Sequence, residues 1–208
     1  MSRATKGVRR TAYALLLLAA ATAAQGLWIP AKAALAQVLL DEAFARGQAG
    51  EPRATPWPWS DAWPVARLRS PRHGSDLVVL SDASGRSLAF GPGHLSGTPL
   101  PGDPGTSVIA GHRDTHFAFL RRLEPGDALL VESRDGRTHR YRVVETAVVH
   151  ADDARVAAEA AVDRLALVTC WPFEAVRPGS DLRFVVLAER EPDPGRFADP
   201  DAPATPRA

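Results

Sequence analysis

The sequence predicts an all-β domain with short helices, placed behind an N-terminal helix that anchors it in a membrane. Two observations predict this arrangement: an uncharged N-terminal segment, and eight short strand-like runs with turn signals between them. Eight short strands in one domain indicate a closed barrel or a sandwich. The chain of 208 residues, less an anchor, is long enough for one ordinary domain.

The N-terminal segment predicts where the domain resides. Four basic residues precede residues 11–31, which carry no charge and approach the ~20 residues that a membrane helix needs. Basic residues ahead of such a helix favour a cytoplasmic N terminus, so the domain is expected outside the cytoplasm. A cleaved signal peptide is the alternative, with Ala21 and Ala23 as the small residues of its cleavage site. The domain is exported in either case.

The composition divides the chain into five parts. We expect a basic cytoplasmic tail at 1–10, the transmembrane signal-anchor at 11–31, a juxtamembrane helix and a Pro/Trp-rich stalk at 32–64, the β domain at 65–190, and a disordered Pro-rich tail at 191–208. Apolar residues at helical spacing predict the helix "KAALAQVLLDEAFAR" over 32–46, which fits packing along the membrane or against the domain.

The β domain consists of short alternating or apolar runs. The predicted strands are Ala66–Arg69, Leu77–Leu80, Ser87–Phe90, Ser107–Ala110, Asp127–Glu132, Arg140–Val149, Leu165–Cys170 and Leu182–Ala188. Asp-Gly within Ser133–Arg137 predicts a hairpin. Two short helices are expected, at Thr115–Leu123 and at Asp152–Val162.

Cys170 is the single cysteine of the chain and ends an apolar strand in "LALVTCWPF". Exported proteins normally use cysteines in pairs, so an unpaired one suggests a reactive thiol. A small buried hydrophobe is the other interpretation. The formal net charge of +1 gives no basic excess, so we expect no nucleic-acid partner.

A reactive thiol needs a partner that favours the thiolate, and six histidines are available. His73, His94 and His139 lie in loops or beside arginines, where solvent exposure explains them, and His150 ends a strand. His112 is different, because it follows the apolar strand Ser107–Ala110 and a glycine, where a side chain emerges at the rim of a barrel.

His112 and His116 are four residues apart, a spacing that can bind zinc on a helix. The zinc-protease pattern needs Glu directly after the first His, and Arg113 stands there. No third ligand is evident, so we expect no metal or other cofactor. Packing on the short helix explains His116 better.

His112, Cys170 and Arg183 follow one another along the chain, each beside a predicted strand, and their segments together resemble a sortase. "AGHRDTHFAFLRRL" is similar to the His segment of that family, "LALVTC" to its T-L-x-T-C strand and "RFVVLAE" to its Arg strand. The resemblance covers about residues 65–189 and is greatest to the proteobacterial sortases of Gram-negative cells. One departure is that Leu165-Ala166-Leu167 stands where Thr-Leu is usual before x-Thr-Cys, so the strand lacks the first Thr of the motif while Thr169 remains.

The resemblance implies a sortase-type eight-stranded β-barrel and a cysteine transpeptidase. Cys170 would be the nucleophile, His112 the general acid and base, and Arg183 the residue that holds the substrate carbonyl or the oxyanion. Substrate-binding candidates are Thr169, Trp171 and His116. Alternation along the strand turns Thr169 to the face opposite Cys170, which favours packing or a hydrogen bond to the backbone.

The resemblance also implies the partners and the location. The substrate would be a protein with a C-terminal LPxTG-like sorting signal, such as one dedicated surface protein with a von Willebrand A-type domain, and the second substrate an amine acceptor. The location would be the inner membrane, with a single span and the catalytic domain in the periplasm. Hydrolysis would replace transfer where no acceptor is present.

Other protein classes fit less well. Cell-wall cysteine peptidases have Cys and His in the reverse order, L,D-transpeptidases have a Ser-His-Gly-Cys pattern, and caspases have Gln-Ala-Cys where this chain has Val-Thr-Cys. A non-enzymatic, membrane-anchored β-barrel that binds envelope proteins and buries Cys170 as a structural residue stays open. A second arginine, Arg177, precedes Pro178-Gly179 and is expected at a solvated loop tip.

Overall fold

A computed structural model of the chain describes residues 13, 15, 16, 22, 32–152, 162–175 and 179–192. The chain divides into two units, Met1–Leu39 and Leu40–Ala208, and the second contains the β domain. A helix runs over residues 32–48, as predicted from its apolar spacing. The predicted transmembrane segment at 11–31 and the predicted tails at 1–10 and 191–208 lie outside the described residues, apart from residues 191 and 192 and the four isolated positions. Within the described residues, no helix has both the length and the apolarity to span a membrane.

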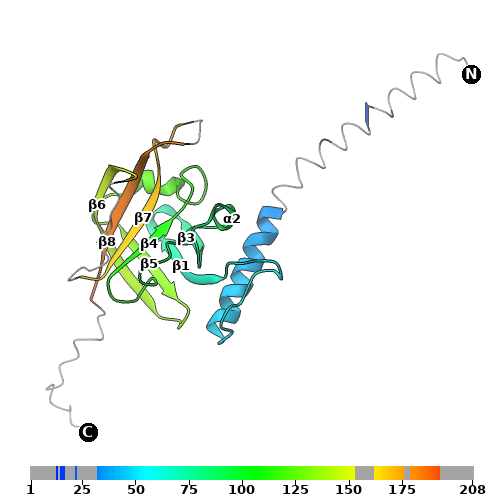
Figure 1. Ribbon diagram of the computed structural model, residues 1–208, viewed down its shortest axis with the longest axis horizontal. Helices are drawn as coiled ribbons and strands as arrows, with labels where there is room; N and C mark the ends of the chain where they lie inside the picture. The colour runs from blue at the N-terminus through cyan, green and yellow to red at the C-terminus, as the bar shows by residue number, and fades with distance from the viewer. Residues whose placement is uncertain are drawn as a thin grey trace, which may run out of the picture. The chain divides into compact units, whose positions relative to one another are not determined.

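The described part of the second unit forms eight strands, two 3-10 helices and one further short α-helix (Figure 1). Along the chain these are β1 (Pro64–Ser70), η1 (Pro71–His73), β2 (Ser75–Leu80), α2 (Gly85–Leu88), β3 (Gly93–His94), β4 (Thr106–Ala110), η2 (Ala118–Arg122), β5 (Ala128–Ser133), β6 (Thr138–His150), β7 (Arg164–Trp171) and β8 (Leu182–Arg190). The strands close into a barrel in the order β1-β2-β3-β4-β7-β8-β6-β5. The expected eight-stranded barrel is therefore confirmed.

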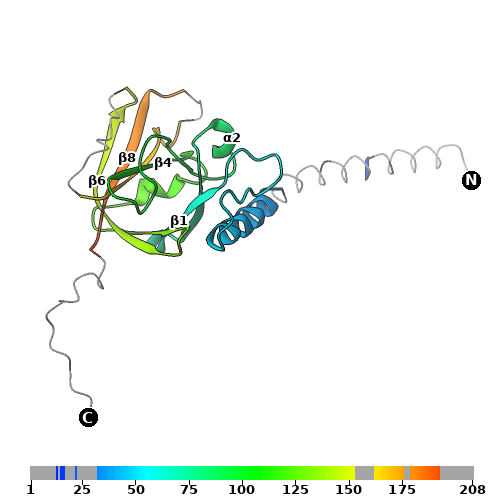
Figure 2. The same ribbon diagram turned by 60° about the horizontal axis from the view of Figure 1, so that its bottom comes forward.

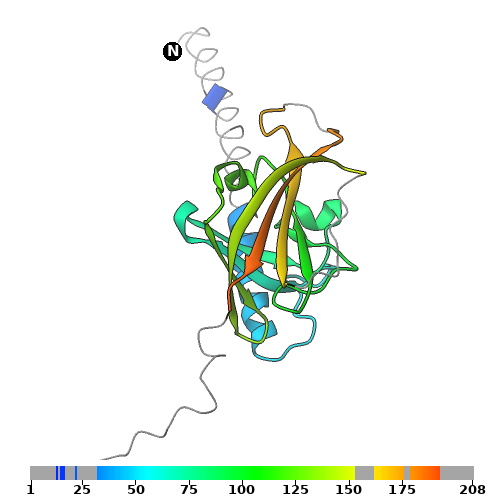
Figure 3. The same ribbon diagram turned by 90° about the vertical axis from the view of Figure 1, so that its left-hand side faces the viewer.

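Most neighbouring strands in the barrel run antiparallel, and two pairs, β2 with β3 and β4 with β7, run parallel. In Figure 3, β6, β8 and β7 run side by side along one wall, in agreement with their register. The barrel is closed most narrowly at β3, which pairs with β2 at one position and with β4 at two. The parallel pair β4–β7 brings the ends of two strands that are far apart in the sequence to the same rim.

The barrel is filled by side chains that alternate along its strands, as the period of two in the sequence predicts. On β7, for example, Leu165 and Leu167 are fully buried in the main core cluster. The members of that cluster are Val65, Ala66, Leu68, Val79, Ile109, Phe117, Phe119, Leu120, Leu123, Leu129, Val131, Tyr141, Val143, Leu165, Leu167, Phe173, Val186 and Ala188. This packed interior fixes the height and the direction of each strand end at the rim.

One predicted strand is wrong. Residues Ser87–Phe90 do not form a strand, because the segment begins with α2 and continues into a turn. Ser84 is the N-cap of α2 and its side chain accepts a hydrogen bond from the backbone N–H of Ser87. The helix cap, and not the strand-like apolar pattern of "SLAF", determines the structure of this segment. The connection between β2 and β3 therefore lies outside the barrel wall (Figure 2).

The eighth strand of the barrel is instead β3, which has only two residues, Gly93 and His94. The remaining seven predicted strands are confirmed: six are one to three residues longer at one or both ends, and β5 begins and ends one residue later than predicted. The Asp-Gly hairpin between β5 and β6 is also confirmed, with Gly136 at a φ of 79° and the Ser133 N–H donating to the carbonyl of Arg137 at 2.9 Å. The first short helix is the 3-10 helix η2, while most of the second, Asp152–Val162, lies outside the described residues.

Candidate active site

Cys170 and Arg183 lie opposite each other at one end of the barrel, where β7 ends and β8 begins (Figure 1). The antiparallel register makes their Cα atoms direct partners, and both side chains are half-buried. Side chains of partner residues project from the same face of a sheet. The Cys170 thiol is not part of a disulfide. Leu165 and Leu167 face the core, so Val168 and Cys170 lie on the outer face of the barrel wall by alternation along the strand.

His112 reaches the same rim through β4. In the parallel pairing of β4 with β7, Ala110 is the partner of Val168, so His112 and Cys170 each follow that row by two residues. Beyond the end of β4, the Gly111 N–H still donates to the carbonyl of Val168 at 3.1 Å, which extends the pairing by one residue. His112 comes directly after this last tether and is exposed.

Thr169 lies on the inner face, away from the thiol, as alternation predicts. Its side chain is buried, and its hydroxyl donates a 2.7 Å hydrogen bond to the carbonyl of Gly111. The predicted hydrogen bond to the backbone is therefore present, and it ties the strand of Cys170 to the residue before His112. A hydroxyl engaged inside the barrel does not face a substrate on the outer side.

Gly111 is required at its position by a close approach. A Cβ atom there would lie 2.8 Å from the ring of Phe117, which is fully buried against the Gly111 backbone. The Phe117 N–H also donates to the carbonyl of His112 at 2.9 Å. The loop that carries His112 is therefore closed on itself by Phe117 and packed against the core at its first residue.

The guanidinium of Arg183 is turned toward its own loop. Its Nη1 donates to the carbonyl of Ser180 at 2.6 Å and to that of Leu182 at 3.0 Å. An ion pair with Asp181 or Glu189 is not found among the described residues, and Glu189 pairs with Arg164 instead at 2.8 Å. The second arginine considered from the sequence, Arg177, lies outside the described residues.

An aromatic cluster supports the end of β7. Trp171 stacks on Phe184 with 5.7 Å between ring centroids, and Phe173 meets both rings edge-on at 5.6 and 5.3 Å. Phe173 is part of the main core cluster, and the peptide bond between Trp171 and Pro172 is cis. Trp171 thus packs with Phe184 beneath the rim, on the face opposite Cys170.

His116 is half-buried beside His112. Burial lowers the pKa of its imidazole below the ordinary value, the positive charge of His112 lowers it further, and Asp114 acts in the opposite direction. His116 lines an open hollow of about 380 Å³ together with Thr115 and the first residues of β2. Within the described residues, no three His, Cys, Asp or Glu side chains come together as metal ligands.

Three histidines expected in solvent are buried, and the prediction for them is wrong. His73 bonds the carboxylate of Asp127 at 3.1 Å, and His94 lies 2.9 Å from the carbonyl of Pro99. His139 lies 2.7 Å from a guanidinium nitrogen of Arg190. Each imidazole is held by a partner that the local sequence does not reveal, which is why their loop or polar surroundings were misleading. His150 ends β6, as predicted, and is exposed.

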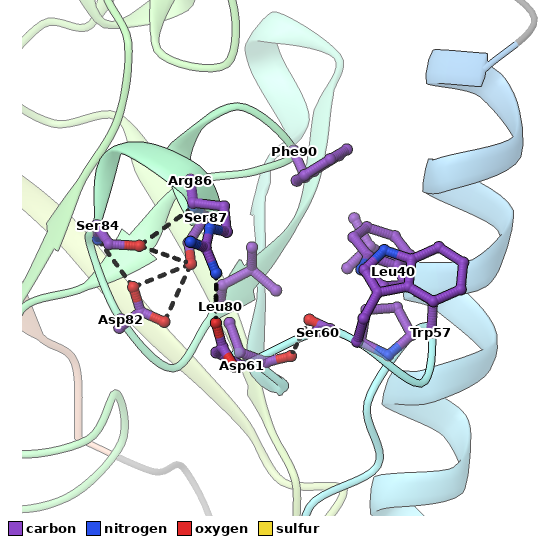
Figure 4. Close-up of a pocket in the computed structure, with 13 residues that line it drawn as sticks. Leu40, Trp57, Ser60, Asp61, Leu80, Asp82, Ser84, Arg86, Ser87 and Phe90 are labelled. Carbon is purple, nitrogen blue, oxygen red and sulfur yellow. Dashed lines mark hydrogen bonds and ion pairs between the residues drawn. The ribbon is translucent and has the colours of Figure 1, made fainter.

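A cavity whose lining does not include Cys170 is shown in Figure 4. Its volume is about 670 Å³, and its lining residues are Leu40, Pro56, Trp57, Trp59, Ser60, Asp61, Ala62, Leu80, Asp82, Ser84, Arg86, Ser87 and Phe90. Burial would raise the pKa of Asp82, but hydrogen bonds from Ser84 and Ser87 lower it, and Arg86 pairs with Asp61 at 2.6 Å. These polar groups organise α2 and its surroundings. The Ser87 hydroxyl donates to Asp82, but the lowered pKa of this carboxylate makes it a weak base, and no His or Cys lines the cavity, so the rim with Cys170 is the better candidate site.

Comparison with known proteins agrees with this geometry. Residues 68–191, which include His112, Cys170 and Arg183, match the model of the family described as Sortase domain. Sortase D of Bacillus subtilis (strain 168) is 30% identical over 124 residues, which are 59% of this chain. The chain spans 62% of the length of that relative.

Solved structures of sortases have the same fold. Sortase C-1 from Actinomyces oris is 32% identical, with a TM-score of 0.54 over 62% of this chain and 75% of that one. Sortase A from Corynebacterium diphtheriae is 25% identical, with a TM-score of 0.58 over 78% of this chain and 87% of that one. The eight-stranded barrel, the family match and these similarities lead to one conclusion: the chain belongs to the sortase family.

Proposed function

We propose that this protein is a membrane-anchored cysteine transpeptidase, which cleaves an LPxTG-like sorting signal between Thr and Gly and transfers the acyl group to an amine. The observation that carries the proposal is the strand register at the rim. The register makes Arg183 the direct partner of Cys170. It also pairs Ala110, the last residue of β4, with Val168, so that His112 and Cys170 each follow this pair by two residues. A nucleophile, a proton carrier and an oxyanion donor from three strands at one rim suit acyl transfer.

The reaction has two halves that share one thioester. The thiolate of Cys170 attacks the carbonyl carbon of the signal's Thr, and the Thr–Gly bond breaks as His112 donates a proton to the leaving amine of Gly. The incoming amine then attacks the thioester carbon, loses its proton to His112 and releases the thiolate. The net change exchanges one amide bond for another, and water in place of the amine gives hydrolysis.

Arg183 stabilises the oxygen that becomes negative in both halves. In the resting structure one nitrogen of its guanidinium holds two backbone carbonyls, of Ser180 and Leu182. A guanidinium has five N–H donors in a planar fork, so this anchoring leaves donors for a substrate oxygen. An anchored donor needs little reorganisation when the oxyanion forms, which is the basis of its catalytic effect.

The surface beneath the thiol suits an extended apolar peptide. Ala110, Val168 and Val185 form one row of partners across β4, β7 and β8, and all three are half-buried. Val168 shares the outer face with Cys170 by alternation. The Leu and Pro side chains of a sorting signal would lie against such a row, with the scissile bond at the thiol.

The location proposed for the domain is the periplasmic side of the inner membrane, with residues 11–31 as a single anchor. The support is the uncharged length of this segment and the basic residues before it. Membrane fractionation of cells that produce the full chain, followed by protease treatment from the periplasmic side, tests this. A soluble product that begins near Ala24 would show a cleaved signal peptide instead.

Mass spectrometry of the intact chain tests the activity. The chain is incubated with LPxTG-like peptides, with and without a simple amine, and the mass added to Cys170 is read. A peptide adduct that disappears when the amine is added, with a new amide product, supports transpeptidation. The Cys170→Ala variant is the matched control and should show no adduct.

The same experiment separates a non-enzymatic barrel from a transpeptidase. Iodoacetamide modifies an activated thiol rapidly in the native state, whereas an inert core thiol reacts only on unfolding. Slow alkylation that does not depend on His112, together with no peptide adduct, would overturn the enzymatic function. Rapid alkylation without an adduct would show that the signal differs from LPxTG, and a wider peptide library would then identify it.

A further inference from the structure

Arg113 directly follows His112, and its side chain reaches the segment after β7. Its Nη2 donates a 2.7 Å hydrogen bond to the carbonyl of Ala175, 62 residues away along the chain. His112 and Asp114 on either side of it are exposed, whereas Arg113 is half-buried. A contact this remote in sequence links the loop after β4 to the segment after β7.

The acceptor of this bond belongs to a segment that is fixed relative to Cys170. The Ala175 N–H bonds the carbonyl of Pro172 at 3.3 Å and closes a turn directly after β7. Phe173 within this turn is part of the main core cluster and is in ring contact with Trp171 and Phe184. The Ala175 carbonyl is therefore joined to Cys170 by five residues whose middle is packed in the core.

The loop is also tied to β7 on the other side of His112. Gly111 accepts a hydrogen bond from the Thr169 hydroxyl and donates one to the carbonyl of Val168. His112 thus lies between two attachments to the strand of Cys170 and its exit, one through the residue before it and one through the residue after it. The first attachment has two hydrogen bonds to the backbone of Gly111, whereas the second is the bond from the Arg113 side chain.

We propose that Arg113 is a positioning residue, which holds the imidazole of His112 at a working distance from Cys170 by anchoring the His112 loop to the Ala175 carbonyl. This inference rests on the proposed function, since it assigns Arg113 an effect on that reaction. A proton carrier must lie within hydrogen-bond reach of the proton it moves, and a displacement of ~1 Å costs about 100-fold in rate. Loops are more mobile than the strands that they join, so a loop-borne base needs such an anchor.

The alternative explanation is that Arg113 acts only by its charge, which would favour a nearby thiolate. Lysine separates the two, because it keeps the charge but has neither the planar fork nor the full reach of arginine. Exposed Arg121, in the same segment, provides a matched control for the loss of one positive charge. The four variants to compare are therefore Arg113→Gln, Arg113→Lys, Arg121→Gln and His112→Gln.

The test is the rate at which iodoacetamide alkylates Cys170 in the full chain between about pH 5 and 9. The melting temperature of each protein is measured at the same pH values. This probe needs no knowledge of the natural substrate. His112→Gln removes the imidazolium and should move the midpoint of the profile to more alkaline pH. We expect Arg113→Gln and Arg113→Lys to move the midpoint at least half as far, and Arg121→Gln to leave it in place.

Each outcome has one meaning. An unmoved midpoint in folded Arg113→Gln, or a complete return to the native profile in Arg113→Lys, would overturn the positioning role. A lower melting temperature with no change in the profile would show a purely structural role. If Arg113→Gln does not fold, the lysine variant decides alone. If His112→Gln itself leaves the native profile unmoved, the proposed function fails at His112, which is distinguishable from a failure of Arg113 alone.

Discussion

Cys170 and Arg183 are direct Cα partners across the antiparallel pair of β7 and β8. They are thirteen positions apart in the sequence (183 − 170 = 13), and the connection between them returns the chain to the same rim. Their relative height is set by the register of two core strands, whose inward residues Leu167 and Val186 are fully buried partners. A donor on a strand is positioned more rigidly than one on a loop, which suits stabilisation of an oxyanion.

The first prediction concerns Arg183. Replacement by lysine keeps the positive charge but loses the fork that holds the carbonyls of Ser180 and Leu182 while it faces a substrate oxygen. We expect Arg183→Lys to lower the rate of thioester formation by about 10- to 1000-fold, the scale of a lost oxyanion donor. The measurement is the rate at which the peptide adduct appears on Cys170 by rapid-quench mass spectrometry.

Arg177→Ala is the control for Arg183, because it removes a guanidinium from the same connection. The turn signal that follows Arg177 predicts a solvated side chain of little energetic effect. Its adduct should form within about threefold of the native rate. The opposite ranking of the two variants would remove Arg183 from the site.

The second prediction concerns the close packing of Gly111. A methyl group at this position would lie 2.8 Å from the ring of Phe117, so either the ring or the loop must move. We expect Gly111→Ala to lower the free energy of unfolding by about 1–3 kcal/mol and to slow the acylation of Cys170, since His112 is the next residue. Chemical denaturation and the adduct rate measure the two effects.

Gly85 in α2 is the matched control for Gly111. A Cβ atom there meets nothing within 4 Å, and its backbone is not in the left-handed region. Gly85→Ala should be neutral or stabilise the protein by up to about 1 kcal/mol, without changing the adduct rate. Equal stabilities of the two alanine variants would mean that the Phe117 ring yields without cost.

The third prediction is a dependence of stability on pH that arises far from the site. Burial acts to raise the pKa of Asp127, but hydrogen bonds from Arg72, from the Glu124 N–H and from His73 outweigh it and lower the pKa from 3.8 to about 2. The folded state therefore binds this proton less readily than the unfolded chain. The stability that Asp127 contributes is complete above about pH 4 and is lost as the pH falls towards 2.

Asp127→Asn should remove this pH dependence and lower the free energy of unfolding at neutral pH by about 1–2 kcal/mol. The measurement is urea denaturation at a series of pH values between about 2 and 7. Exposed Asp103→Asn changes the charge equally and serves as the control. Parallel stability curves for native and Asp127→Asn protein would show that the carboxylate is not responsible.

The sequence was sufficient to predict the strands that carry the site, because β7 and β8 have long apolar runs with clear boundaries. It could not predict β3, since the two residues Gly93 and His94 have no periodicity to read. Ser87–Phe90 was read as a strand from its apolar residues, while the cap at Ser84 determines its structure. Local patterns decide long strands, whereas short elements depend on capping and on their neighbours in the barrel.

The candidate site shows the same limit. Cys170 and His112 were found because a lone thiol and a His after an apolar strand are visible along the chain. Arg113 was noted only as the residue that breaks a zinc-protease pattern, since its partner Ala175 is remote in sequence. Side-chain contacts to backbone carbonyls leave no signal in residue types, because every residue has a carbonyl. Such residues are found from coordinates, as are the buried partners of His73 and His139.

The last prediction tests the inner tether between the strands of the site. The Thr169 hydroxyl donates to the Gly111 carbonyl inside the barrel, and valine has nearly the same shape without the donor. A buried acceptor that loses its partner costs about 1–3 kcal/mol, so Thr169→Val should lower the free energy of unfolding by this amount. Thr146→Val on β6, where the side chain is half-buried, provides the control and should change stability by less than about 0.5 kcal/mol.

Because this hydrogen bond joins the residue before Cys170 to the residue before His112, Thr169→Val should also slow iodoacetamide alkylation at neutral pH, while Thr146→Val should not. Loss of stability without any change in alkylation would mean that the β4–β7 backbone pairing alone holds the two side chains at the rim.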